Sequence, residues 1–321
     1  MTSTDHISRI SQMAEEAGAK LVPIGDQEQQ QSPEAGGLFR QMVEDGPHYS
    51  LNTVRRFKNE DGTVREWEAD ASLALRRGDA RALEAYDRHG LIQGGTLEEM
   101  KAAVVQAYVA DTVAGRESVC ITVTNARATE LSREIRGRLV QYGLVEEHGT
   151  LLVDDNRAGV GDLIQARNND PKLKDSDGMR VLNRRVYRVT GIGDDGQLTA
   201  RRVAGRNDDG SERLAGNVSL PGAYVKDHVT LAYAGTSHAV QGRTVGYGGY
   251  TLAEEGMTRN QVYPSLTRVI RVNRIMAACD IPADEHRLEG FHQDPLSMVQ
   301  GALTRDGGEL SALQELRESQ D

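Results

Sequence analysis

The 321-residue chain has a formal net charge of −10, with 27% charged and 38% hydrophobic residues. Its length suffices for one large or two ordinary domains, and its acidity argues against a protein that coats nucleic acid by bulk charge, although clustered arginines allow a local basic groove. The N-terminal region is polar, no apolar run approaches the roughly 18 residues that span a membrane, and the isolated Cys120 and Cys279 lack zinc spacing. We therefore expect a cytoplasmic protein without a metal site of its own.

The chain opens with half of an α/β unit. Residues 3–18 have the helical period, with Gly18 as a C-terminal stop, and residues 20–24 read as a short buried strand. The loop Gly25-Asp26-Gln27-Glu28-Gln29 follows directly. A carboxylate and an amide at the end of a strand can orient a water, a magnesium shell or a terminal phosphate, and a merely structural loop is the alternative.

Helices and strands then alternate as in a protein with a parallel sheet. The expected elements are helices at 67–77, 80–89 and 96–114, a core strand at 118–124, and a helix at 126–142 with Asn125 as its N-cap. From about residue 149, short strands in Gly/Asp/Asn-rich surroundings predict a small antiparallel barrel. Parallel-sheet character resumes at 228, so we expect the barrel to be an insertion, and after 281 a polar tail with one short helix at 308–320.

Arg56 and the segment 233–245 could carry chemistry. An arginine next to another arginine usually belongs to a solvated face, but one that enters a cleft between domains can clamp a phosphate. The hydrophobic run 228–232 leads into a segment that places hydroxyl, imidazole and amide groups at a strand end, where open α/β sheets bind ligands. Downstream, Arg268 could supply a cation to an anionic ligand.

In this order the segments resemble the helicase part of TraI/TrwC-type (MobF) conjugative relaxase-helicases, which are RecD-like superfamily 1 DNA helicases. Residues 25–29 match helicase motif III, Arg56 falls at the motif IV arginine, residues 233–245 match motif V, and residues 266–268 match motif VI. The resemblance covers about residues 5–275.

The resemblance implies an α/β, RecA-like P-loop NTPase helicase fold, in which two RecA-like domains clamp ATP and Mg²⁺ between them. Single-stranded DNA would lie across both domains, and movement along it would run 5′ to 3′. The implied parts are a remnant of the first RecA-like domain (1–50), the second RecA-like domain (51–148 and 229–280), an inserted SH3-like β-barrel (149–228) and the polar tail (281–321).

The resemblance also assigns roles to single residues. The γ-phosphate would be contacted or sensed by Gln29, Arg56 and Arg268. Positions close to the nucleotide or metal fall to Gly25, Asp26 and Gly242, the last of which would let backbone approach a ligand. Coupling of the nucleotide to DNA falls to Thr236, His238 and Gln241.

The sequence departs from the family pattern in ways that limit its activity. It contains no Gly-x-x-x-x-Gly-Lys-Ser/Thr phosphate loop and no apolar strand ending in Asp-Glu, and motif VI continues as Val269-Ile270-Arg271 where the family has Gly-Arg. We expect the chain to begin just after the magnesium motif, to be inactive as an ATPase alone, and to be completed by an upstream polypeptide. The alternatives are a stand-alone module that binds single-stranded DNA or regulates, and a decayed gene remnant.

Overall fold

The computed structural model describes residues 4–26, 38–51, 53–207, 211–240, 244–281 and 291–305. The N-terminal region forms the helices α1 (Thr4–Glu16) and α2 (Leu38–Asp45). Gly18 ends the first helix as predicted, with φ of +59° in the left-handed region that glycine adopts readily. The prediction of a strand at 20–24 is wrong, and Ile24 is 92% exposed. A strand needs a neighbour for its backbone groups, and no strand of the described ranges pairs with this segment.

A five-stranded sheet in which every pairing is parallel forms the centre of the molecule. Its strands are β1 (Ile92–Gly95), β2 (Ser118–Thr122), β12 (Ala234–Thr236), β13 (Gly248–Ala253) and β14 (Val272–Ala278), in the order β1-β14-β13-β2-β12. Every residue of β2 and β13 is buried, as expected for parallel strands covered on both faces. This confirms the predicted α/β fold class with a central parallel sheet.

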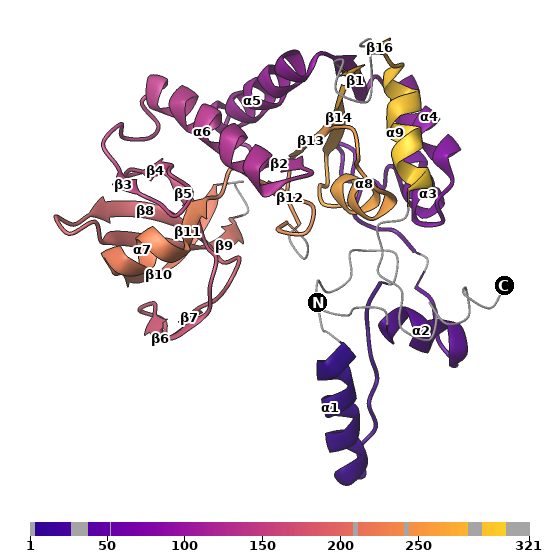
Figure 1. The fold of residues 1–321 in the computed structure, drawn as a ribbon, viewed down its shortest axis with the longest axis horizontal. Helices are drawn as coiled ribbons and strands as arrows, with labels where there is room; N and C mark the ends of the chain where they lie inside the picture. The colour runs from indigo at the N-terminus through magenta and orange to yellow at the C-terminus, as the bar shows by residue number, and fades with distance from the viewer. Residues whose placement is uncertain are drawn as a thin grey trace.

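Helices cover both faces of the parallel sheet (Figure 1). One face packs against α5 (Leu97–Val113) and α6 (Asn125–Gln141). The other packs against α3 (Glu66–Arg76), the 3₁₀ helix η1 (Ala80–Ala82), α4 (Leu83–Arg88), α8 (Arg259–Leu266) and α9 (Pro295–Thr304). The strand pleat sorts the side chains, since Cys120 of β2 joins the first core while its neighbour Ile121 faces the opposite side.

The predicted helices at 67–77, 80–89, 96–114 and 126–142 and the strand at 118–124 are confirmed within a few residues. The N-cap of α6 is Thr124 rather than Asn125, because the Thr124 hydroxyl accepts a hydrogen bond from the backbone N–H of Arg127. The polar tail was expected too early: α9 buries Met298 and Leu303, among others, against the second face. The helix expected at 308–320 lies outside the described residues.

An antiparallel sheet is inserted between α6 and β12. Its strands are β5 (Leu163–Ala166), β8 (Val186–Ile192), β9 (Leu198–Arg206), β10 (Glu212–Leu220) and β11 (Val229–Leu231), in the order β10-β9-β8-β5-β11, with α7 (Gly222–His228) before the last strand. The small strand pairs are β3 (Thr150–Leu151) with β4 (Arg157–Ala158), β6 (Asp170–Lys174) with β7 (Arg180–Val181), and β15 (Asp280–Ile281) with β16 (Phe291–His292).

The strand expected at 228–232 forms as β11, but it pairs antiparallel with β5. Parallel pairing therefore resumes at β12, later than the sequence suggested, because the apolar run completes the inserted sheet before the chain crosses over. In the described residues β10 and β11 are the two edges of this sheet, so it is open there. The SH3-like assignment and the domain boundaries stay predictions.

A buried polar junction joins the inserted sheet to the parallel sheet. The Tyr233 hydroxyl, just before β12, donates to Asp162 Oδ1 at 2.5 Å. The other carboxylate oxygen of Asp162 accepts from Arg136 Nε of α6 and from the Gly159 N–H, both at 2.7 Å. Burial raises the pKa of Asp162, and the bond from Tyr233 is the largest of the contacts that oppose the rise. Three donors thus hold one buried carboxylate where the two sheets meet.

Candidate functional site

Arg268, the predicted motif VI arginine, is buried at the end of α8 with 3% of its surface exposed. Its Nε donates to the Pro264 carbonyl oxygen at 2.9 Å, and its Nη2 donates to Thr267 Oγ1 at 3.3 Å. The Thr267 hydroxyl in turn donates to the Tyr263 carbonyl at 3.0 Å. The last turn of the helix therefore fixes where the guanidinium lies.

Arg56, the predicted motif IV arginine, lies beside Arg268. The backbone N–H of Lys58 donates to the Ile270 carbonyl at 3.1 Å, which ties the two chain segments together. Burial and then the positive charge of Arg56 lower the pKa of Arg268 to about 10, and burial lowers the pKa of Arg56. Arg56 makes no hydrogen bond or ion pair with any residue of the described ranges. These two cations, one buried and one half-buried, can both donate to an anion.

Asp26, from the predicted motif III loop, completes the cluster. Its carboxylate accepts from the Tyr263 hydroxyl at 3.2 Å and pairs with Arg76 Nη2 at 3.2 Å. Burial and then the charge of Asp26 raise the pKa of Tyr263 to about 12, so this hydroxyl remains a donor at neutral pH. We call Asp26, Arg56, Arg76, Tyr263 and Arg268 the arginine cluster; within it, positive groups outnumber the single carboxylate.

The sequence located part of this cluster. It singled out Asp26, Arg56 and Arg268, which the structure brings together, but it missed Arg76 and Tyr263. A basic residue in the last turn of α3 was a signal for Arg76, although such residues commonly serve the helix dipole. Gly25 packs on Phe39, since an added Cβ would lie 3.0 Å from Cζ of that ring. Gln29 lies outside the described residues.

Thr236 and His238 lie in one tight turn at the carboxyl end of β12. The Thr236 hydroxyl accepts from the Ala239 N–H at 3.2 Å, and its carbonyl accepts from the Val240 N–H at 3.1 Å. Arg184 of the inserted part donates through Nη1 to the His238 carbonyl at 2.8 Å. Burial and then Arg184 lower the pKa of His238. Gln241 and Gly242, also predicted here, lie outside the described residues.

Backbone bonds connect this turn to the arginine cluster. The Val245 N–H donates to the Arg268 carbonyl at 2.9 Å, and the Ile270 N–H donates back to the Val245 carbonyl at 3.0 Å. Val240, Val245 and Val269 also form a small apolar cluster with side chains of β2. The predicted motif V and motif VI segments are thus adjacent in space. The turn after β12 lies at one end of this contact, and the guanidinium groups of Arg56 and Arg268 lie at the other.

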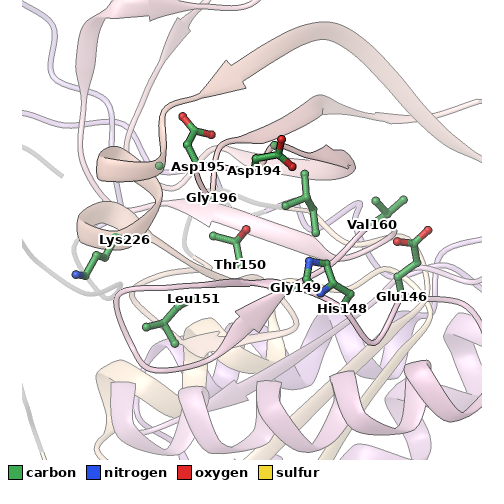
Figure 2. A pocket seen from close by; sticks show the side chains of 13 residues that line it. Glu146, His148, Gly149, Thr150, Leu151, Val160, Asp194, Asp195, Gly196 and Lys226 are labelled. Carbon is green, nitrogen blue, oxygen red and sulfur yellow. The ribbon is translucent and has the colours of Figure 1, made fainter.

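Two hollows lie in or beside the inserted part. A cavity of about 740 Å³ is lined by Glu146, His148, Asp194, Asp195 and Lys226, among others (Figure 2). None of the predicted site residues lines it. A smaller hollow of about 240 Å³ lies between α6 and the inserted sheet and is lined by Asn125, Thr129, Arg167 and Gly235, among others. It reaches β12 directly before the turn.

Within the described residues no group of three or more His, Cys, Asp or Glu side chains could hold a metal ion. No described helix is both long enough and apolar enough to cross a membrane.

Two known proteins with similar sequences are conjugal transfer proteins, and a family model also matches. A family model described as an AAA domain matches residues 1–97. The probable conjugal transfer protein TraA of Sinorhizobium fredii is 29% identical over 277 residues, and the conjugal transfer protein TraA of Rhizobium radiobacter is 30% identical over 278 residues. Each alignment covers 84% of this chain and 23% of the relative, so the chain spans about a quarter of the length of these curated relatives.

Among solved structures, the Pif1 helicase from Bacteroides in complex with ADP-AlF3 and ssDNA is 15% identical, with a TM-score of 0.49 over 85% of this chain and 66% of that chain. The Pif1 helicase from Candida albicans is 11% identical, with a TM-score of 0.44 over 89% of this chain and 69% of that chain.

The parallel sheet and the sequence relatives define a helicase-like α/β protein related to conjugation proteins. More particularly, the chain is similar to conjugal transfer proteins, and this similarity supports the resemblance of its motifs to the helicase region of conjugative relaxase-helicases.

Proposed function

We propose that the chain is the γ-phosphate-sensing and DNA-coupling part of an ATP-dependent 5′ to 3′ DNA helicase of conjugative transfer, and that it works in the cytoplasm on single-stranded DNA. The observation that carries this proposal is the pairing of Arg56 with Arg268. Two guanidinium groups in one place offer several charged donors, and the γ-phosphate of a nucleotide is an anion that such donors bind.

The residues present fit one end of a nucleotide. The guanidinium groups of Arg56 and Arg268 can donate to terminal phosphate oxygens, and Gln29 is proposed to join them. Bound ATP with Mg²⁺ would supply the free energy for movement. The phosphate loop and the magnesium carboxylate are proposed to come from an upstream polypeptide, because the sequence contains neither motif. We therefore expect the purified chain to show no DNA-stimulated ATP hydrolysis, and robust turnover would contradict this.

The coupling role is proposed for Thr236, His238 and Gln241, with Gly242 close to the ligand. Support comes from the backbone bonds between Val245 and Arg268, because a shift of the guanidinium groups on phosphate binding would move the segment that leads back to the turn. The turn also lies beside Arg184, which suits a phosphate of single-stranded DNA.

The arginine cluster can be tested with inorganic tripolyphosphate as the probe. A ligand that binds only the folded state raises the thermal midpoint of unfolding. We expect tripolyphosphate to raise the midpoint of the wild-type chain and of Arg274→Met, which removes an exposed arginine of β14. The rise should be lost in Arg56→Met and Arg268→Met. If tripolyphosphate raised the thermal midpoint equally in Arg56→Met and Arg274→Met, the proposal would be contradicted.

The variant Arg56→Met also tests whether the two neighbouring cations, Arg56 and Arg268, destabilise the fold. Because the substitution removes a like charge beside Arg268, we expect the midpoint without ligand to stay equal or rise, whereas loss of a structural cation would lower it. A lowered midpoint without ligand would assign Arg56 to the fold rather than to a phosphate.

A stand-alone module that binds single-stranded DNA is the second candidate. Arg167 and Arg184 favour it: burial and then the charge of Arg167 lower the pKa of Arg184, and Arg184 donates to the His238 carbonyl oxygen, so two cations lie near the turn. In that case a dT oligonucleotide would bind with a strong dependence on salt, while tripolyphosphate would leave the midpoint unchanged.

A further inference from the structure

Arg184 links the inserted sheet to the turn at 236–240. It lies in the connection between β7 and β8, and its Nη1 donates to the His238 carbonyl oxygen at 2.8 Å. The donor is charged and half-buried, so the bond is stronger than one between neutral groups in water. A side chain of the inserted part therefore fixes a backbone atom of the predicted motif V.

The backbone of Arg184 is itself firmly placed. Its N–H donates to the Ala166 carbonyl at 2.7 Å, and its carbonyl accepts from Gln165 Nε2 at 3.1 Å. Its φ of +68° lies in the left-handed region, which glycine and asparagine adopt more readily than arginine. Glycine would adopt this left-handed backbone conformation with less strain. We therefore attribute the arginine at this position to the contacts of its side chain.

The contacted carbonyl lies at the centre of a short chain of contacts. Residues Ala239 and Val240 follow it and donate to the Thr236 hydroxyl and carbonyl. The Val240 side chain is buried against Val245 and Val269, and Val269 directly follows Arg268. Packed and hydrogen-bonded groups thus connect the turn with the segment that carries Arg268.

We propose that Arg184 is a positioning residue that holds the turn at 236–240 and makes the geometry of this turn depend on the placement of the inserted sheet. The positioning of the turn by Arg184 does not depend on the proposed function, whereas its importance for DNA coupling rests on that function. The inserted sheet then acts as a fixed support for the turn, and a change in its placement alters how the turn presents itself to DNA.

Hydrogen exchange of the full chain without DNA tests the hold. Arg184→Met should increase exchange at the Ala239 and Val240 amides about tenfold, as expected when a hydrogen bond from a charged donor is lost. Amides of β9 and β13 should be unaffected. The matched control is Arg185→Met, which removes the neighbouring arginine and its 3.1 Å bond to the Arg180 carbonyl within the inserted part. Unchanged exchange in Arg184→Met, or the same increase in Arg185→Met, would overturn the proposal.

Arg184→Gly separates positioning from general stability. Glycine relieves the left-handed backbone while removing the side chain, so the midpoint of global unfolding should not fall, yet the turn should exchange as fast as in Arg184→Met. Normal protection of the turn in this variant would also refute the proposal, and this variant decides the matter if Arg184→Met folds poorly.

Binding of a dT oligonucleotide forms a separate arm. If the wild-type chain binds it, Arg184→Met should weaken binding more than Arg185→Met does, although each loses one positive charge. Equal weakening would count against a role in coupling. If the wild-type chain does not bind the oligonucleotide, the proposed function fails, and the exchange experiment still decides whether Arg184 holds the turn.

Discussion

The imidazole of His238 belongs to the turn that follows β12. The ring is half-buried and lies near Arg184, and these two causes, burial first, lower its pKa from the ordinary value of about 6.5. His238 is therefore neutral at neutral pH. Since its pKa is lower in the folded state than in the unfolded chain, its contribution to stability is present above about 6.5 and is lost as the pH falls through the folded value.

A titration followed by NMR of labelled histidine rings checks this. We expect His238 to titrate below about 6.5, and Arg184→Met to raise its pKa toward that value, because a nearby positive charge is removed. Arg185→Met should leave the pKa of His238 unchanged. A value at or above that of an exposed histidine in the wild-type chain would contradict the assignment.

Two of the predicted site residues lie close together in the structure. Arg56 and Arg268 were found through their order along the chain, and the structure places them side by side. Tyr263 and Arg76 were missed because their role depends on the packing of α3 against α8, which no local pattern records. Contacts between distant segments could be predicted only where the family resemblance assigned both segments to the same site.

Secondary-structure elements were predicted well where capping and periodicity agree. Thr96 and Glu99 form a reciprocal capping box at the start of α5, and that helix was predicted within a residue at each end. Strands were harder, because the run at 228–232 and the run at 118–124 look alike but join different sheets. Which sheet a strand joins is decided by its neighbours, not by its own residues.

Glycine substitutions separate helix propensity from close packing. Gly137 lies on the exposed side of α6, and a Cβ there would meet nothing within 4 Å. Gly137→Ala should raise the free energy of unfolding by about 0.5–1 kcal/mol. At Gly248 of β13 a Cβ would clash with Asp111 Oδ2 and with Ser118 Oγ.

Gly248→Ala should therefore lower the free energy of unfolding by about 1–3 kcal/mol, because the buried carboxylate and its hydroxyl partners must shift. Urea unfolding monitored by circular dichroism measures both variants. An unchanged or higher free energy of unfolding for Gly248→Ala would show that packing at β13 is more adaptable than the structure indicates, and a lower one for Gly137→Ala would contradict the first prediction.

At the scale of the whole molecule, the inserted sheet and the parallel sheet share one hydrophobic core. Ile164 and Leu198 of the inserted sheet belong to the same buried cluster as Val104 and Leu131 of the helices α5 and α6. The buried junction of Tyr233 with Asp162 lies in the same region. The inserted part is thus an integral layer of the fold. In contrast, α1 buries no residue.

Because the core is continuous, the two sheets should lose structure together. In hydrogen exchange at increasing urea concentration, amides of β9 and β13 should become unprotected at the same concentration, and amides of α1 well before them. Earlier loss at β9 than at β13 would mean that the inserted sheet opens as a separate unit.

The order of the strands along the chain determines when the parallel sheet can be completed during synthesis, because β2 pairs through Cys120 with Ala234 of the later strand β12. β12, β13 and β14 all follow the inserted sheet in the chain, whereas the strands of that sheet are contiguous in sequence. Synthesis from the N-terminus therefore delivers a finished inserted sheet while β1 and β2 still lack their neighbours. Until then, α5 and α6 can pack their apolar side chains against the inserted sheet, as they do in the complete fold. The inserted sheet, which interrupts the parallel sheet in sequence, can therefore cover these helices before β12, β13 and β14 are made.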